Sequence, residues 1–211
     1  MKPESLRVAL DAKGFLDPDE GLALHRAGLR AAASGLGPLL EIGTYCGKSA
    51  VYLGEAAREG GAILFSIDHH RGSEEIQPGW EHHDPEVVDA RTGRMDTLPF
   101  ARRTIADAGL EDHVVLIVGS SIVVAAGWAK PLALVFIDGG HGTDVEWADY
   151  RAWSPLIAPG GWLAIHDVFP DPAEGGRPPY EIYRAALASG GFTEDEAGGC
   201  GSLRVLRRRP A

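Results

Sequence analysis

Cysteine is scarce in this chain, which has only Cys46 and Cys200 among its 211 residues. Two cysteines that form no CxxC pair exclude a disulfide framework, and they are compatible with a reducing compartment. We interpret both as small side chains that fill space in the interior.

Long apolar runs are absent as well. No apolar stretch reaches the roughly 18 residues that a membrane-spanning helix needs. The first residues, MKPESLRVALDAKGF, carry charges where a secretory signal would have its apolar core. We therefore expect a soluble, cytoplasmic protein with no membrane partner.

Positive charge is in short supply. The chain has 20 Lys and Arg residues against 30 Asp and Glu residues, and its formal net charge is -10. Nucleic-acid binding requires a basic face that neutralises phosphates. The arginines at 207–209 are too few to provide one, so we expect no nucleic-acid partner.

Short aliphatic runs alternate with helical patterns along most of the chain. The length fits a single domain. Buried strands are predicted at Pro38–Gly43, Ala62–Asp68, His113–Gly119, Leu132–Asp138 and Gly161–His166, with helices at Lys48–Arg58, Leu98–Ala108, Ile122–Trp128 and Asp144–Leu156. This βα rhythm predicts a parallel sheet covered on both faces, which is a doubly wound α/β fold.

The flanking segments complete the predicted architecture. N-terminal helices are expected at about 3–34, mainly over Asp19–Ser34, and the core follows at about 38–207. After the fifth strand we expect a loop over Pro170–Pro179, a helix over Tyr180–Ala188 and an antiparallel hairpin formed by Phe192–Glu196 and Ser202–Arg207. The irregular stretch Arg71–Asp96 has the length of a lid or binding segment.

The first strand ends in a loop that differs from the dinucleotide pattern. It reads Glu41-Ile-Gly43-Thr-Tyr-Cys-Gly47-Lys-Ser49, and its glycines allow a close approach of the backbone to a ligand. An acidic side chain inside the strand end suits a ligand with an ammonium group. Asp68 ends the second strand, where a carboxylate can accept both ribose hydroxyls.

These motifs resemble the class I S-adenosylmethionine-dependent methyltransferases over Pro38–Leu206. The resemblance implies a mostly parallel seven-stranded, Rossmann-like sheet in a single domain spanning 1–211. It also implies S-adenosylmethionine as cofactor, with S-adenosylhomocysteine as product. The residues that it assigns to cofactor binding are Glu41, Gly43, Thr44, Gly47, Ser49, Asp68, Ser120 and Asp138.

Two further motifs end the fourth and fifth strands. Asp138-Gly-Gly-His141 and His166-Asp167 place two carboxylates at neighbouring strand ends, where they can converge on Mg²⁺ or a similar hard ion. His166 is predicted to complete this metal site or to support it, although imidazole suits Mn²⁺ or Zn²⁺ better than Mg²⁺. His141 is predicted to act as the general base that deprotonates the acceptor hydroxyl.

The same motifs resemble the metal-dependent sugar O-methyltransferases of the macrocin O-methyltransferase type. In those relatives an acidic residue precedes the last Asp, whereas this chain has His166. The resemblance implies Mg²⁺-assisted transfer to a sugar hydroxyl of a small-molecule or oligosaccharide acceptor. In its most specific form, the resemblance implies that the methyl acceptor is the 1-OH of 3-O-methylmannosides in methylmannose polysaccharide biosynthesis. A homodimer formed through the N-terminal helices is an expectation by analogy.

Three other interpretations remain open: an O-methyltransferase for catechols, phenols or other small molecules, a nicotinamide oxidoreductase, and a non-catalytic binding domain. The histidine pairs His69-His70 and His82-His83 lack accompanying cysteines, so substrate contacts are favoured there over a Zn²⁺ site. Trp80 and Tyr45 either pack in the interior or stack on a ligand.

Overall fold

The computed structural model describes residues 1–73, 83–140 and 142–210. Its main sheet has seven strands in the order β5-β2-β1-β6-β7-β9-β8, with the first five parallel and the last two antiparallel. The strands are β1 (Leu39–Ile42), β2 (Leu64–Asp68), β5 (Val114–Val118), β6 (Leu132–Ile137), β7 (Ile157–Ile165), β8 (Phe192–Glu194) and β9 (Arg204–Arg208). The predicted α/β fold class with its C-terminal hairpin is confirmed.

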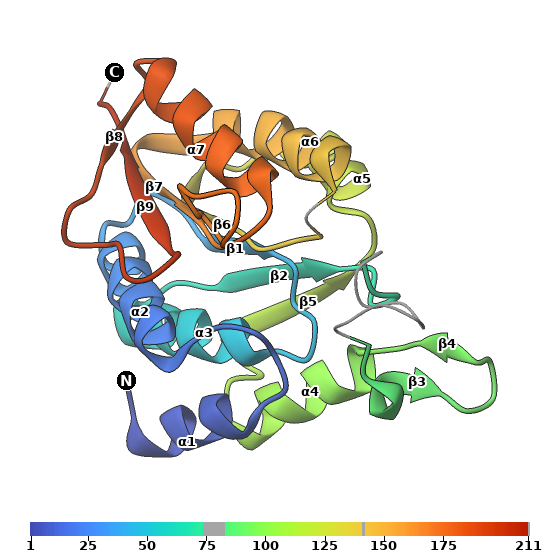
Figure 1. The fold of residues 1–211 in the computed structure, drawn as a ribbon. Helices are drawn as coiled ribbons and strands as arrows, with labels where there is room; N and C mark the ends of the chain where they lie inside the picture. The colour runs from blue at the N-terminus through green and yellow to red at the C-terminus, as the bar shows by residue number, and fades with distance from the viewer. Residues whose placement is uncertain (74–82, 141, 211) are drawn as a thin grey trace.

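Helices cover both faces of this sheet (Figure 1). On one side lie α1 (Pro3–Asp11), α2 (Pro18–Ala33), α3 (Lys48–Gly60) and α4 (Leu98–Asp107). On the other side lie α5 (Ser121–Ala126), α6 (Thr143–Trp153) and α7 (Arg177–Ala188). The sheet is therefore the middle of three layers, as the βα rhythm predicts.

Alternate side chains of the central strands enter two separate apolar cores. On β6, Leu134 and Phe136 pack with residues of α2 and α3, whereas Val135 and Ile137 pack with residues of α6 and α7. This division follows from the two-residue repeat of a strand. Because both faces are buried, the strands read in the sequence as continuous apolar runs.

The N-terminal region consists of two helices separated by an extended segment. Asp17 caps α2 by accepting a hydrogen bond from the backbone N–H of Asp19 at 2.9 Å, and Pro18 occupies the first helical position. Residues 13–16, between α1 and α2, lie at the carboxyl ends of the central strands, where they help to form a cleft.

Two expected loops contain regular structure. Helix α7 begins at Arg177, three residues before the predicted start, because Pro178 and Pro179 fit in the first turn of a helix. The stretch 71–96 contains a short 3₁₀ helix, η2 (Pro85–Val87), and a small antiparallel hairpin formed by β3 (Val88–Asp89) and β4 (Arg94–Met95), which projects from the sheet (Figure 1). The part of the predicted lid at 74–82 lies outside the described residues.

Among the described residues, no helix combines the length and the apolar character required to cross a bilayer.

Candidate active site

A cleft opens at the carboxyl ends of β1 and β6, where the strand order reverses. The helix after β1 covers one face of the sheet and the helix after β6 covers the other, so this edge holds the crevice that ligands occupy in open α/β sheets. The cleft has a volume of about 660 Å³. The predicted site residues that line it are Gly43, Thr44, Ser49, Asp68, Ser120, Asp138 and Asp167.

The loop after β1 depends on Gly43. Its φ angle is +96°, and a Cβ atom at this position would lie 2.0 Å from the backbone oxygen of Asp138. Any side chain here would push β1 and β6 apart at the mouth of the cleft. Gly47, with φ +93°, precedes the first residue of α3 and does not line the cleft. The backbone of Gly43 thus lies close to the end of the neighbouring strand β6.

Asp68 holds the β1 loop in place. One carboxyl oxygen accepts a hydrogen bond from the backbone N–H of Tyr45 at 2.8 Å, and the other accepts one from the backbone N–H of His70 at 2.7 Å. Tyr45 and His70 both have positive φ angles, of 46° and 57°. Each carboxylate oxygen has more than one acceptor site, so Asp68 can serve this loop and also accept hydrogen bonds from a ligand in the cleft.

Glu41 is fully buried beneath the loop and does not line the cleft. Burial raises the pKa of this carboxyl to about 8, although the hydroxyls of Ser66 and Ser49 oppose the rise. Ser66 donates a hydrogen bond to one carboxyl oxygen at 2.6 Å, and Thr44 in turn contacts Ser66. The other oxygen has no hydrogen-bond partner among the described residues. The predicted contact of Glu41 with the donor stays a prediction.

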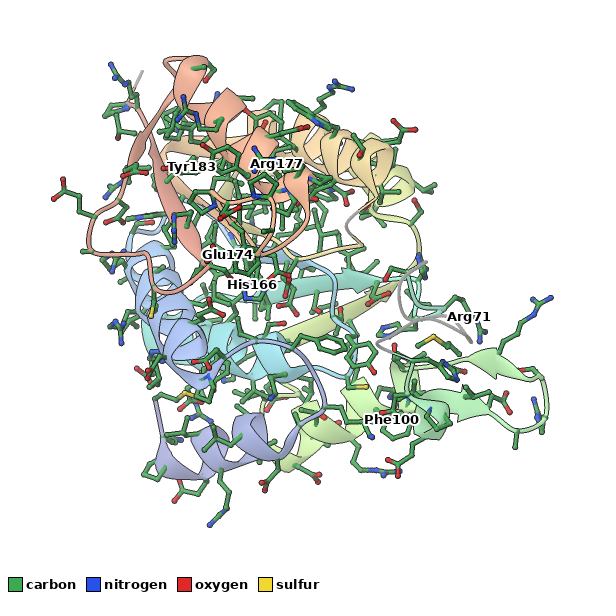
Figure 2. All side chains as sticks on the ribbon, viewed as in Figure 1. Arg71, Phe100, His166, Glu174, Arg177 and Tyr183 are labelled. Carbon is green, nitrogen blue, oxygen red and sulfur yellow. The ribbon has the colours of Figure 1, made fainter. Side chains whose placement is uncertain are left out.

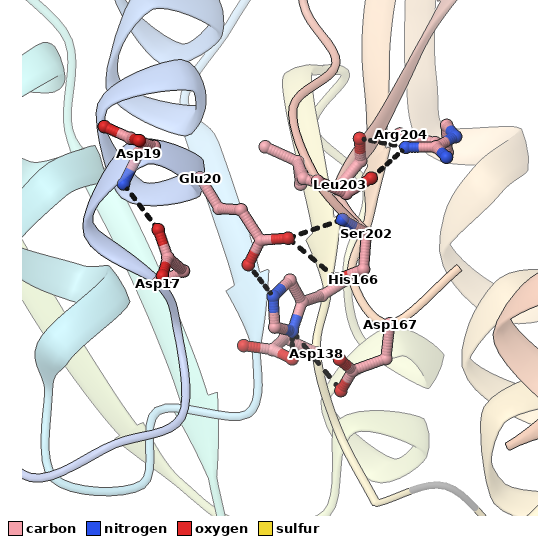
Figure 3. Close-up of polar contacts among 10 residues, drawn as sticks. Asp17, Asp19, Glu20, Asp138, His166, Asp167, Ser202, Leu203 and Arg204 are labelled. Atoms are coloured by element: carbon pink, nitrogen blue, oxygen red, sulfur yellow. Dashed lines mark hydrogen bonds and ion pairs between the residues drawn. The ribbon is translucent and has the colours of Figure 1, made fainter. Parts of the chain in front are cut away.

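The ends of β6 and β7 bring Asp138, His166 and Asp167 together (Figure 3). His166 Nδ1 lies 3.1 Å from Asp138 Oδ1 and 3.4 Å from Asp167 Oδ2. The two carboxylates are about one-fifth and one-quarter exposed and face the cleft, whereas the imidazole is 4% exposed. In Figure 2, His166 lies in the interior between the two helical layers.

The opposite edge of the His166 ring contacts the N-terminal part of the protein. Nε2 lies 2.8 Å from Glu20 Oε2, and Glu20 Oε1 accepts hydrogen bonds from the backbone N–H of Ser202 at 2.5 Å and from its hydroxyl at 2.9 Å. Figure 3 shows this chain of contacts from α2 through His166 to the carboxylates. The sequence reasoning gave Glu20 and Ser202 no role, because 146 residues separate Glu20 from His166.

The charges in this network shift each other's ionisation. Burial lowers the pKa of His166, but the surrounding Asp138, Asp167 and Glu20 outweigh it and raise the pKa to about 12. For Glu20, burial acts in the opposite direction and raises the pKa. The hydrogen bonds from His166 and Ser202 outweigh burial and lower the pKa of Glu20 to about 2. When no metal ion is bound, His166 is therefore protonated, and its ring nitrogens pair with carboxylates on both sides.

The Asp138, His166 and Asp167 group fits a divalent metal ion. Its ligand atoms all lie within 4.8 Å of one another. In an octahedral site with bonds of about 2.1 Å, adjacent ligand atoms are about 3 Å apart, and the 3.1 and 3.4 Å separations match that spacing. No other group of three acidic, histidine or cysteine side chains within 1–73, 83–140 and 142–210 meets the same test.

His141, the predicted general base, lies outside the described residues, as do His82 and Trp80. The other histidines differ from one another. His69 is half exposed and lines the cleft. His70 is buried, with Nδ1 2.7 Å from the hydroxyl of Thr97. In the described part of the chain these histidines form no metal cluster.

One wall of the cleft was missed in the sequence. Residues 13–16 line the cleft, and the exposed ring of Phe15 lies 5.7 Å from the ring of Tyr45. Lys13 forms ion pairs with Asp84 and Glu86, both at 2.6 Å. In the sequence, the only hint of this wall is Gly14, which lies between the two N-terminal helices. Tyr45 packs against Phe15 and the apolar cluster of Cys46, Val87 and Met95, and it also lines the cleft, so both of its predicted roles stay open.

Most charged residues that line the cleft are acidic. Besides the predicted residues, Asp144, Val145, Asp149 and Ile122 line the cleft. Burial raises the pKa of Asp149, and Ser121 opposes the rise by donating a hydrogen bond to it. Lys48 also lines the cleft, in the first turn of α3. The arrangement favours ligands that carry positive charge next to the carboxylates.

Comparison with solved structures gives the same fold. The O-methyltransferase TomG from Streptomyces achromogenes, solved with S-adenosylmethionine, is 18% identical with a TM-score of 0.65, and the match covers 99% of this chain and 91% of that one. An O-methyltransferase from Bacillus cereus, solved with S-adenosylhomocysteine, is 17% identical with a TM-score of 0.66 over 99% and 92% of the two chains. Cofactor-bound Rv0187 from MTB is 20% identical with a TM-score of 0.62 over 98% and 88%.

A family model described as a methyltransferase domain matches residues 40–168. The matched region begins in β1, includes the loop after it and Asp68, and ends just after His166 and Asp167. The group Asp138, His166 and Asp167 and most of the cleft therefore fall inside the match, whereas the wall formed by residues 13–16 lies before it. Because it spans more than half of the chain, the protein belongs to the methyltransferase domain family.

Proposed function

We propose that this protein transfers a methyl group from S-adenosylmethionine to a hydroxyl oxygen of a small molecule, with help from a divalent metal ion. One observation carries the proposal: the metal-binding group Asp138, His166 and Asp167 opens into the same cleft as Asp68 and the loop after β1. Such a cleft can hold a cationic donor next to a metal-bound acceptor.

The donor half of the cleft is formed by β1, β2 and β5. Asp68 and Ser120 line this half of the cleft, and we assign Asp68 to accept hydrogen bonds from the ribose hydroxyls and Ser120 to contact the adenine. The carboxylates of the wall complement the positive charge of a sulfonium. Lys48 and Ser49, in the first turn of α3, offer a cation and a hydroxyl to the donor's carboxylate. The solved O-methyltransferases that contain S-adenosylmethionine or S-adenosylhomocysteine support this choice of donor.

The acceptor half is formed by the ends of β6 and β7 and by residues 13–16. A divalent ion supplies a Lewis acid that lowers the pKa of an acceptor hydroxyl. Asp138, His166 and Asp167 would hold that ion. His141 stays the predicted base that removes the hydroxyl proton. Alignment of the two reacting atoms in an enclosed cleft then supplies much of the rate.

The volume of the cleft supports a small acceptor. A value of about 660 Å³ lies within the roughly 300–1,000 Å³ typical of small-molecule sites. Phe15, which is 62% exposed, and Tyr45 present rings on which a flat or ring-shaped acceptor can pack. These rings support a phenol, a catechol or another small ring-shaped alcohol. The 1-OH of a 3-O-methylmannoside, expected from the sequence, is the sugar candidate for the same position.

The test combines binding and turnover. Titration with S-adenosylmethionine is followed by methyl transfer to a panel containing a catechol, a phenol, mannose and a 3-O-methylmannoside, each with and without Mg²⁺ or Mn²⁺. We expect donor binding, and metal-dependent transfer that is lost in Asp138→Asn and in His141→Ala. Transfer to the mannoside alone would favour the sugar acceptor. Preferential binding of a nicotinamide cofactor, or no donor binding, would refute the proposal.

A further inference from the structure

The contact between Glu20 and His166 has a consequence for the metal ion. A histidine has two ring nitrogens, and the hydrogen bond made by one decides which nitrogen is free to bind a metal. Here Nε2 faces Glu20 at 2.8 Å, while Nδ1 faces Asp138 and Asp167. An ionised carboxylate only accepts hydrogen bonds. Glu20 therefore retains the proton on Nε2 and leaves Nδ1 as the metal-binding atom.

Glu20 is itself fixed by the C-terminal part of the chain. Its Oε1 accepts two hydrogen bonds from Ser202, and Glu20 is 7% exposed. Gly201, with φ +54°, brings the chain so close that a Cβ atom would lie 2.4 Å from Glu20 Oε1. These contacts leave Glu20 Oε2 directed at the imidazole, so the orientation of the His166 ring is set from outside the cleft.

We infer that Glu20 is a positioning residue that makes His166 Nδ1 a metal ligand, and that the resulting one-nitrogen, two-carboxylate site prefers a transition-metal ion such as Mn²⁺ over Mg²⁺. Magnesium favours oxygen ligands, whereas imidazole nitrogen suits the first-row transition metals. This inference rests on the proposed function only in assuming that the cleft holds a metal ion. It adds which ion the site selects and which residue outside the cleft determines that choice.

Glu20→Gln is the informative variant, because it preserves the size of the side chain. The two donors of Ser202 keep the amide oxygen on their side, so the amide N–H₂ group faces His166 Nε2. Nε2 must then accept a hydrogen bond, and the ring proton moves to Nδ1, which can no longer bind a metal. Loss of such a supporting partner weakens metal binding by about 10- to 100-fold.

The experiment measures metal binding directly on the full chain. Dissociation constants for Mn²⁺ and Mg²⁺ are determined by calorimetry, and pulsed electron paramagnetic resonance of bound Mn²⁺ reports coupling to an imidazole nitrogen. We expect nitrogen coupling and a strong preference for Mn²⁺ in the unmodified protein. His166→Asp should remove the coupling and reduce the preference by about tenfold, because the site then offers only oxygen ligands. Glu20→Gln should weaken Mn²⁺ binding by about 10- to 100-fold.

Glu59→Gln is a matched control. Glu59 on α3 also contacts a histidine, His25, at 3.5 Å, but this pair lies outside the cleft. Distant sites act independently, so its Mn²⁺ affinity should stay within about twofold of that of the unmodified protein. Bound Mn²⁺ without nitrogen coupling, or an unchanged affinity in Glu20→Gln, would overturn the inference. Donor titration in the absence of metal tests the proposed function separately, and failure there leaves the metal measurements intact.

Discussion

At the scale of single residues, the cleft depends on groups in uncommon environments. Gly43 occupies a backbone conformation that side chains rarely adopt, and Glu41 is a carboxyl group with no exposure to water. Both positions were selected from the sequence as cofactor-binding residues. Those roles stay predictions. The sequence did not reveal the approach of Gly43 to Asp138 or the hydrogen bond from Ser66 to Glu41, since neighbouring strands create these contacts.

Gly43→Ala should disrupt the cleft. Its Cβ atom would lie 2.0 Å from the backbone oxygen of Asp138, so the ends of β1 and β6 would have to separate. We expect loss of donor binding and a large fall in melting temperature. Gly109→Ala is the control, because Gly109 has φ +62° with no atom within 4 Å of the added carbon. The free energy of unfolding of that variant should fall by only roughly 1–2 kcal/mol, which is the cost of a left-handed conformation for a residue with a side chain. Equal falls in melting temperature for Gly43→Ala and Gly109→Ala, measured by calorimetry, would show that the contact of Gly43 with Asp138 does not matter.

Glu41 should make stability depend on pH. Its pKa is raised in the folded protein to about 8 from an ordinary value of 4.5, so the folded state keeps a proton that the unfolded state loses as pH rises above 4.5. The stabilisation present below pH 4.5 is lost as pH rises through 8, at a cost of about 3 kcal/mol by pH 7. In Glu41→Gln this loss disappears.

The measurement is thermal unfolding of both proteins between pH 5 and pH 9. The melting temperature of Glu41→Gln relative to that of the unmodified protein should rise from pH 5 to about pH 8 and then level off. A constant difference would show that Glu41 does not change its protonation on unfolding.

At the scale of elements, the strands and helices of the βα repeat were predicted more accurately than the loops between them. Short aliphatic runs bounded by Gly or Asp gave β2 and β6 to within two residues. The start of β7 was predicted at Gly161, yet the strand begins at Ile157, because a register shift between Leu132 and Leu134 on β6 accommodates the intervening residues. Neither this irregularity nor the wall formed by residues 13–16 leaves a periodic signal in the sequence.

The segment between α1 and α2 should matter more for binding than for stability. Lys13 connects it to Asp84 and Glu86, which raise the pKa of its ammonium and keep it charged. These groups are partly exposed, and such pairs contribute only about 0.2–1 kcal/mol. We expect Lys13→Met to shift the melting temperature by no more than about 4 °C while weakening donor binding measurably, because residues 13–16 line the cleft.

Lys130→Met provides the comparison, since Lys130 precedes β6 at the edge of the sheet away from the cleft. Its donor affinity should match that of the unmodified protein. Titration calorimetry that finds the same affinity in both variants would remove the functional role of Lys13.

At the scale of the whole molecule, the cleft joins parts of the protein that are distant in sequence. Loops after β1, β2, β5, β6 and β7 contribute to it together with residues 13–16. Parallel strands bring their carboxyl ends to one edge, which is why the sequence alone could group Asp68, Asp138 and Asp167. Glu20 escaped that reasoning because it comes from a helix outside the βα repeat.

Donor binding should stabilise the entire fold. A ligand that binds only the folded state adds about 2.7 kcal/mol at 100 times its dissociation constant. For a chain of this length that corresponds to a rise of roughly 5–10 °C in melting temperature. Differential scanning fluorimetry with S-adenosylmethionine should show this rise, whereas adenosine monophosphate at the same concentration should produce a smaller one. No rise with S-adenosylmethionine would instead support a non-catalytic binding domain.

The contact between Glu20 and Ser202 also links the site to the order of synthesis. Glu20 and Ser202 are 182 positions apart in the sequence. During synthesis on a ribosome, Ser202 is added about 2 to 7 s after His166 at typical rates of elongation. A nascent chain that already contains Asp138, His166 and Asp167 still lacks the donors that orient Glu20. We expect Ser202→Ala, which removes the hydroxyl donor and keeps β9, to bind Mn²⁺ more weakly than the unmodified protein in the same calorimetric titration. Under the proposed role of Glu20, metal binding at full affinity therefore requires the turn before β9 to be in place.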